Sequence, residues 1–312
     1  MIQRERGTVR STSDGCRRYL PVFISFDTRN RILEQEVSPD WEPDIQNQWR
    51  ENKRAIEAEL VQEYGHWHRE QKLQNYRSID AAPFSIVALH NTFLDQIRRS
   101  FVAGAYFPAL VGACALGERV LNQLVIELRD EYSDHQATTP KLHENGIMKN
   151  RALTNWKDCR SALVNWGVIS DIVSQEFAEL FQLRSRAIHY NRNLDGSDAR
   201  ELALAAVLHI QKVIESQFAP LGGPPRFIEG ISGNSFLSTE AEQQPFIRRF
   251  FLPSCVLVSP RFEMRHTTDD EGSSWFEVYD DESYQDEYPT LTDEEFASHR
   301  SDPARYLPPI QP

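Results

Sequence analysis

An arginine and a histidine, Arg184 and His189, stand five positions apart in the stretch 170–191. A guanidinium binds phosphate oxygens through a fixed fork of N–H donors, and an imidazole takes up or releases a proton near neutral pH. Together they have the chemistry needed to hold a phosphodiester and to move a proton during its cleavage. An arginine beside an apolar helix face is rarely buried without a partner, so the pair requires either a ligand site or a structural contact.

The same stretch predicts an amphipathic helix. Its apolar residues recur at spacings of three, four and seven; they are Ile172, Val173, Phe177, Leu180, Phe181 and Ile188. On an ideal helix Arg184 and His189 would point about 140° apart, so the helix must end or bend near them if both are to reach one phosphate. The turn formers Asn191 and Asp195-Gly196 follow and support such an end.

The run Arg-Ser-Arg-Ala-Ile-His at 184–189, with a long apolar helix carrying Glu118 upstream and another amphipathic helix downstream, resembles the signature of the HEPN superfamily. That signature is an arginine followed, after four to six residues, by a histidine. The resemblance covers residues 85–218 and implies a helical bundle that works as a homodimer, with both motifs lining a shared cleft. Members include metal-independent ribonucleases of bacterial defence and toxin–antitoxin stress response.

Carried over by position, the resemblance assigns roles to individual residues. It implies that Arg184 binds the scissile phosphate and that His189 takes part in cleavage. Glu118 would lie near Arg184, and the substrate-binding residues would be Glu118, Ser185, Arg186 and Asn191. Ser185 stands where active members often carry Asn, Asp or His. No metal or cofactor is needed, because the nucleophile is the 2′-hydroxyl of the RNA and arginine meets the charge on the phosphorane.

A structural interpretation of the same residues stays open. Arg184 would then cap helix carbonyls or pair with a carboxylate such as Glu118, and His189 would be a hydrogen-bonded histidine at a helix end. The corresponding function is a non-catalytic helical module that binds a nucleotide or a partner protein. Ser185, and a body of the protein without net charge, favour this alternative.

The net charge of the 312-residue chain is −12, which is unfavourable for binding RNA. Residues 269–302 contain 13 acidic side chains and one basic one, Arg300, so this segment alone accounts for the net charge. The rest of the chain is neutral, and local groups of arginine there can attract phosphate. These groups are Arg98-Arg99, Arg184-Arg186-Arg192 and Arg248-Arg249.

The acidic C-terminal segment carries aromatic anchors such as Tyr284 and Tyr288. From its composition we expect residues 267–312 to be largely disordered. One hypothesis is that this tail imitates nucleic acid, covers the arginine–histidine motif and restrains it. Deletion of residues 268–312 would then increase RNA binding or cleavage.

Several classes of protein are excluded by pattern. The four cysteines lie far apart and form no CxxC pair, which argues against a zinc site and a disulfide framework. His66 and His68 stand two positions apart on an expected helix, where they point to different sides. No run approaches the about 20 apolar residues of a membrane helix, and the N-terminus lacks the apolar core of a signal peptide. We therefore expect a cytoplasmic protein without a membrane partner.

The pattern of elements predicts a mainly α fold, an HEPN-like helical bundle with a small strand-rich C-terminal appendage. Helical spacing indicates helices over 44–77, 84–100, 101–132, 153–166, 171 onward and 198–218. Short apolar runs between 226 and 266, including Pro-Phe-Ile-Arg-Arg-Phe-Phe-Leu-Pro, predict strands. The expected segments are an N-terminal arm with a strand (1–40), a long amphipathic helix (41–82), the bundle (83–219), a β-rich cap (220–266) and the acidic tail (267–312).

Packing of the bundle is expected to depend on small and aromatic residues. The helix over 101–132 carries glycines, among them Gly112 and Gly117, that let a neighbouring backbone approach. Trp156 and Trp166 have apolar neighbours, so we expect them in the core rather than stacked on bases. His209 is expected in the core or at its boundary.

Overall fold

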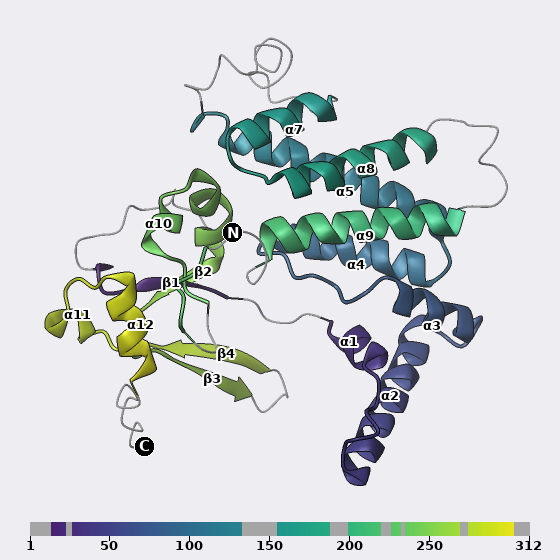
Figure 1. Ribbon diagram of the computed structural model, residues 1–312, viewed down its shortest axis with the longest axis horizontal. Coiled ribbons are helices and arrows are strands. Elements are labelled where there is room, and N and C mark those ends of the chain that lie inside the picture. Colours follow the sequence, from purple (N-terminus) through teal and green to yellow (C-terminus); the bar gives the residue numbers. More distant parts are fainter. Residues whose placement is uncertain are drawn as a thin grey trace. The chain divides into compact units, whose positions relative to one another are not determined.

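The structure, a computed structural model, describes residues 14–22, 27–132, 155–187, 199–219, 226–231, 235–268 and 274–302. The chain divides into two units. The helical unit comprises Ile24–Gly223, and the terminal unit comprises Met1–Phe23 together with Pro224–Pro312. The described fold is mainly helical with small antiparallel two-stranded sheets in the terminal unit (Figure 1), which confirms the expected fold class at this level.

The helical unit is built around α5. Helices α4, α8 and α9 run alongside it, and α7 packs against α5 and α8 (Figure 1). The helices of this unit are α1 (Arg29–Glu34), α2 (Pro43–Tyr64), α3 (Arg69–Ser78), α4 (Ala88–Val102), α5 (Tyr106–Leu128), α7 (Trp156–Asn165), α8 (Asp171–Ala187) and α9 (Ala199–Phe218). The expected helices from residue 84 onward are present in outline, with ends that differ by a few residues.

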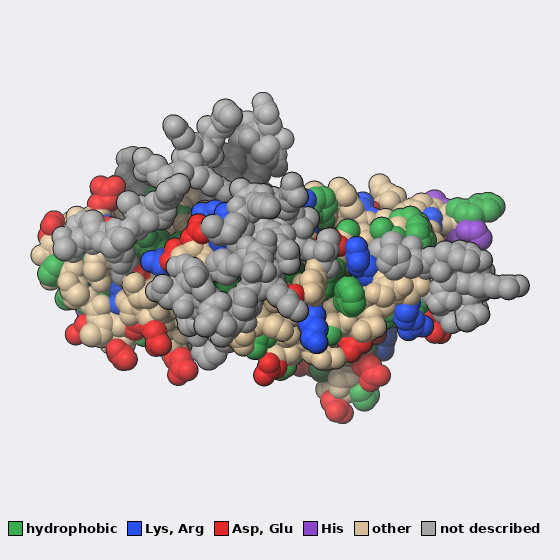
Figure 2. All heavy atoms as spheres, turned by 90° about the horizontal axis from the view of Figure 1, so that it is seen from above, with side chains coloured by type: hydrophobic (Ala, Val, Ile, Leu, Met, Phe, Trp, Pro, Cys, Tyr) green, Lys and Arg blue, Asp and Glu red, His purple; other side chains and the backbone are tan. Residues whose placement is uncertain are grey.

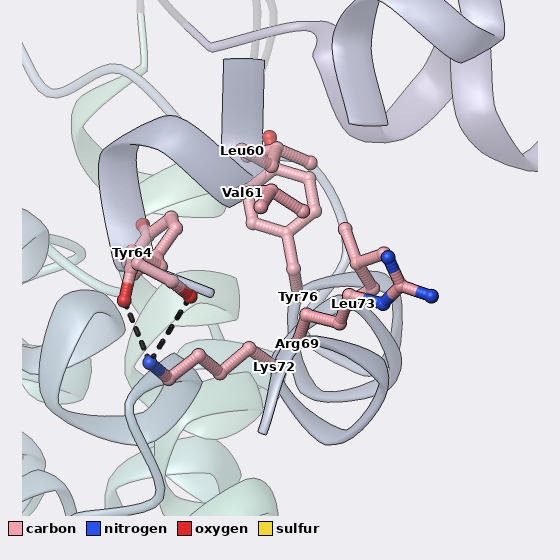
Figure 3. Close-up of a pocket in the computed structure, with 8 residues that line it drawn as sticks. Leu60, Val61, Tyr64, Arg69, Lys72, Leu73 and Tyr76 are labelled. Carbon is pink, nitrogen blue, oxygen red and sulfur yellow. Dashed lines mark hydrogen bonds between the residues drawn. The ribbon is translucent and has the colours of Figure 1, made fainter. Parts of the chain in front are cut away.

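The single long helix expected over 44–77 is two helices. Helix α2 ends at Tyr64. The next residue, Gly65, has a φ of 83°, which glycine adopts readily and other residues adopt only with strain, and His68 at φ 53° precedes α3. Lys72 of α3 donates to Tyr64 O at 2.7 Å, as Figure 3 shows for the crevice where α2 and α3 meet. His66 and His68 therefore lie in a turn, and no cluster of three metal-ligating side chains occurs among the described residues.

Close packing on α5 depends on glycine. A Cβ at Gly112 would lie 2.9 Å from Ile97 Cγ1, which is too close for any other residue without a shift of that side chain. Gly104, with φ 85°, breaks the expected helix over 101–132, so α5 begins only at Tyr106. The expectation that small residues let neighbouring helices approach is confirmed at Gly112.

Helix α5 bears on the expectation that the chain has no membrane helix. Among the described residues it is the one helix long and apolar enough to cross a membrane, contrary to the expectation from sequence that no run comes close. In the structure, 56 % of its most apolar 18-residue window is buried. That burial is typical of the core helix of a soluble protein; the cytoplasmic location stays a prediction.

His90 of α4 gives the helical unit a testable pH dependence. The side chain is 1 % exposed and contacts Ser85 Oγ through Nδ1 at 3.0 Å. Burial lowers the pKa of His90 to about 4, whereas an unfolded chain binds this proton near pH 6.5. Between these two pKa values the unfolded chain binds more protons than the folded chain. The free energy of unfolding therefore decreases as the pH falls, and His90 accounts for a decrease of about 3 kcal/mol between pH 7 and pH 4.

Urea unfolding at a series of pH values checks this expectation. A His90→Gln variant should lose this part of the pH dependence, whatever its stability at neutral pH. Equal slopes of unfolding free energy against pH in the two proteins would show that His90 is not held neutral by the fold.

The terminal unit brings the two ends of the chain into one fold. Strand β1 (Arg18–Pro21) pairs antiparallel with β2 (Cys255–Val258), and β3 (Glu263–Thr268) pairs antiparallel with β4 (Ser274–Tyr279). The other elements are α10 (Thr239–Glu242), the π-helix η4 (Ile247–Phe251), the 3₁₀ turn η5 (Leu252–Ser254), α11 (Tyr284–Glu287) and α12 (Asp293–Ser301). The expected N-terminal strand is present at Arg18–Pro21, and residues 23–26 lie outside the described chain.

One predicted strand is wrong. The run Pro-Phe-Ile-Arg-Arg-Phe-Phe-Leu-Pro is helical over 245–251, although its β-branched and aromatic residues favour a strand locally. Phe246, Ile247, Phe250 and Phe251 recur at helical spacing, and all four are buried. Burial of this stripe outweighs the local preference.

The acidic segment is folded over 274–302, so the expectation of a disordered tail is wrong for this part. Thr292 and Glu295 form a capping box at the start of α12. The buried core of the terminal unit joins residues from both ends of the chain: Cys16, Leu20, Phe236, Val258, Phe262, Tyr284, Leu291 and Phe296. The sequence separation between these contributors explains why local composition indicated disorder.

Carboxylates of this segment pair with arginines of the same unit. Arg17 Nε lies 3.2 Å from Asp280 Oδ2, and Arg18 Nε lies 2.6 Å from Asp293 Oδ1. Deletion of residues 268–312 would therefore remove part of a core together with these ion pairs. Such a deletion tests the folding of the terminal unit rather than restraint of the motif.

Candidate functional site

Helix α8 carries Arg184 on its last turn. The helix packs on α5 and α9, and its buried residues include Val173, Phe177 and Leu180. Arg184 follows Leu180 by four residues and so lies on the same side of the helix, about 6 Å farther along its axis. The apolar side of α8 thereby places the guanidinium of Arg184 at the end of the interface that α8 forms with α5 and α9.

Glu118 of α5 meets this arginine. Arg184 Nη2 lies 3.2 Å from Glu118 Oε2, and the two side chains are 31 % and 27 % exposed. The adjacent Gly117 allows the helices to come this close, because a Cβ there would lie 3.2 Å from both Leu180 Cδ1 and Trp156 Cη2. The expectation that Glu118 lies near Arg184 is confirmed, and both the ribonuclease and the structural interpretation contain it.

The structure describes only some of the remaining motif residues. Ser185 is half-buried and Arg186 is exposed on the same turn as Arg184. His189 and Asn191 lie outside the described residues. Their roles, and the end or bend of the helix between Arg184 and His189, stay predictions.

In the group Arg98-Arg99, Arg98 is buried and cannot form part of a surface for phosphate. Arg98 is 5 % exposed and donates to Ile79 O at 3.0 Å and to Asp80 O at 2.9 Å. Arg99 Nε lies 2.7 Å from Asp95 Oδ2. Helix packing occupies the guanidinium of Arg98, so the expectation is wrong for Arg98. Arg99 is 51 % exposed, and its attraction for phosphate stays a prediction.

The other arginine groups belong to different units or lie partly outside the described residues. Arg192 lies outside the described residues, and Arg248 and Arg249 belong to η4 of the terminal unit. On the face drawn in Figure 2, described basic side chains are interspersed with acidic ones. On this face, any attraction for RNA by the described residues is therefore local rather than spread over a basic patch.

Two buried cysteines lie near the Arg184–Glu118 pair. Burial raises the pKa of Cys114 to about 11 and that of Cys159 to about 12. The thiol of Cys114 donates to Leu180 O at 3.8 Å. Both cysteines are protonated at neutral pH, so neither supplies a thiolate nucleophile.

A hollow of about 440 Å³ opens between α7 and α8, one helical turn before Arg184. It is lined by Asn155, Trp156, Lys157, Arg160, Phe181 and Gln182. Sequence reasoning missed this hollow, because its residues come from two helices whose juxtaposition no local pattern reveals. The available signal was Lys157 and Arg160, two cations three residues apart and therefore on one side of a helix.

The other predicted side chains of the bundle lie largely as expected. Trp156 and Trp166 are 2 % and 9 % exposed, which confirms them as core residues. His209 is half-buried at the core boundary, where its Nδ1 lies 2.6 Å from Glu176 Oε2. This acid–imidazole contact joins α8 to α9.

No protein-family model, curated protein or solved structure matches the chain.

Proposed function

We propose that the chain is a metal-independent endoribonuclease of the HEPN type, acting as a homodimer in defence or toxin–antitoxin stress response. The observation that carries the proposal is the position of Arg184, partly exposed at the end of α8 and held by Glu118 of α5 at 3.2 Å. A guanidinium has five N–H donors, so a single carboxylate orients it and leaves donors for a phosphate. In a dimer, two such arginines would face one RNA strand.

In the proposed reaction the 2′-hydroxyl of RNA attacks the adjacent phosphorus. The bond from phosphorus to the 5′-oxygen of the next nucleotide breaks, which leaves a 2′,3′-cyclic phosphate and a 5′-hydroxyl. His189 takes part in the transfer of the proton that leaves the 2′-oxygen and of the proton that reaches the departing oxygen. Arg184 stabilises the negative charge that develops on the phosphorane.

The test is incubation of purified wild-type and His189→Ala protein with a mixed RNA pool in EDTA, with molar mass measured in parallel. We expect cleavage by the wild type alone, from a dimer, with both proteins folded. Equal cleavage by the variant would contradict the role of His189, and an active monomer would contradict the shared site.

A non-catalytic module that binds a nucleotide or a partner protein is the second candidate. Glu118 already pairs with Arg184, and the negative end of the helix dipole stabilises a cation on the last turn of α8 without any ligand. This function predicts binding of RNA or nucleotide without strand cleavage. Degradation of RNA by the purified wild type, lost in the His189 variant, would refute it.

A further inference from the structure

The hollow between α7 and α8 has the size of a small-ligand site. Its volume of about 440 Å³ falls within the range of roughly 300 to 1,000 Å³ that is common for such sites. Three kinds of side chain line it, namely cations, aromatic rings and carboxamides. That mixture matches the parts of a nucleotide, which has an anionic phosphate, a flat base and hydrogen-bonding edges.

Two cations on α7 line the hollow. Lys157 is exposed and forms no ion pair with a carboxylate in the described part of the chain. Arg160 donates through Nη1 to Ser174 O at 2.8 Å, while its Nε is buried without a hydrogen-bond partner. The hydrogen-bond acceptor of Arg160 is thus a neutral carbonyl. Burial lowers the pKa of its guanidinium, because the charge loses contact with water and no described carboxylate compensates for that loss. An anion in the hollow would supply that missing charge.

The ring of Phe181 forms the aromatic wall on the α8 side. Phe181 is half-buried, and its ring packs against Trp156 with centroids 5.8 Å apart. Trp156 is itself 2 % exposed and contacts Phe177 with centroids 6.4 Å apart. These contacts hold the Phe181 ring in place, and a base that stacks on a ring already held loses less conformational freedom on binding.

The hollow adjoins the arginine of the proposed active site. Phe181 precedes Arg184 by three residues, so the two side chains lie about 60° apart around α8 and about 4.5 Å apart along it. Gln182 is exposed on the same turn and presents both an amide donor and an acceptor. A strand whose phosphate is held by Arg184 would bring a neighbouring nucleotide to this wall.

We propose that the α7–α8 hollow binds one unpaired nucleotide of the RNA strand whose phosphate contacts Arg184, with its base against Phe181 and its phosphate near Lys157 and Arg160. The placement of this nucleotide next to the phosphate held by Arg184 rests on the proposed function. The hollow's recognition of RNA is separable from cleavage. It would make the protein select single-stranded RNA, because a paired and stacked base cannot enter such a hollow.

The test measures binding of a short 2′-O-methyl RNA, which cannot be cleaved through its 2′-oxygen, to the full chain. Lys157→Ala should weaken binding about threefold and lower the salt slope of log Kd by about one. Phe181→Leu keeps an apolar side chain but removes the stacking face, so we expect binding to weaken about tenfold. Matched controls are Lys212→Ala, 51 % exposed on α9, and Phe107→Leu, 61 % exposed on α5.

The outcomes separate this subsite from the ribonuclease itself. Weaker binding in both hollow variants but not in the controls supports the subsite, even if the wild type cleaves no RNA. Unchanged binding in the hollow variants overturns it, even if the wild type is an active ribonuclease. A wild type that binds single-stranded RNA no better than duplex RNA also overturns it.

Discussion

Replacing Arg184 with alanine is expected to lower the rate of RNA cleavage about 100-fold or more, because it removes the donor assigned to the charge of the transition state. The fold should survive this change. Arg184 and Glu118 are 31 % and 27 % exposed, and a solvent-screened pair of this kind contributes about 1 kcal/mol or less. Single-turnover cleavage, with circular dichroism to follow folding, measures both effects.

Arg186→Ala is the matched control for this experiment. Arg186 is exposed on the same turn of α8, and two residues of helix rotate it about 160° away from Arg184. Its loss removes one positive charge from the same helix end, so we expect a small decrease in binding of RNA and little change in the cleavage step. Equal loss of cleavage in the two variants would assign the effect to net charge and contradict the specific role of Arg184.

Asp293→Asn is expected to destabilise the terminal unit by about 3 to 5 kcal/mol, because it leaves a buried cation without its counter-charge. Arg18 is fully buried, and its Nε lies 2.6 Å from Asp293 Oδ1. Asp293 Oδ2 also accepts from Thr239 N at 3.0 Å, so the carboxylate joins β1, α10 and α12. Urea unfolding, with hydrogen exchange of the β1 amides to identify the unit that opens, measures the loss.

Glu294→Gln provides the comparison, since Glu294 is the next residue on α12 and is exposed. Neutralising it changes the net charge equally without touching the buried pair, so we expect a change within about 0.5 kcal/mol. If the two variants unfold at the same urea concentration, the Arg18–Asp293 contact does not stabilise the unit.

The sequence predicted the helical unit well because its information is local. Apolar residues at helical spacing located α5, α8 and α9. The nearness of Glu118 to Arg184 was implied by the family resemblance, and the structure contains that pair. Local turns were harder to place, since the glycines at 65 and 104 break helices that apolar spacing alone continues. Glycine can adopt a positive φ, but it does not always do so. The sequence alone therefore does not show which glycines end a helix.

The terminal unit was misjudged because its stabilising contacts span the chain. The separation of 263 residues between Arg17 and Asp280 hides their ion pair from any local reading of charge. A segment of net charge −12 was therefore expected to be disordered. In the structure its carboxylates Asp280 and Asp293 pair with Arg17 and Arg18 near the N-terminus. The α7–α8 hollow escaped prediction for the same reason, because it exists only where two helices meet.

The claim that the chain cleaves RNA through the 2′-hydroxyl is tested most directly with two oligonucleotides of one sequence in EDTA. One is RNA throughout, and the other carries a 2′-O-methyl group at the nucleotide that precedes the mapped cleavage position. We predict that the wild type cleaves the first into products with a 2′,3′-cyclic phosphate and a 5′-hydroxyl and leaves the second intact at that position. Cleavage of both at the same position, or of neither, would contradict the proposed reaction.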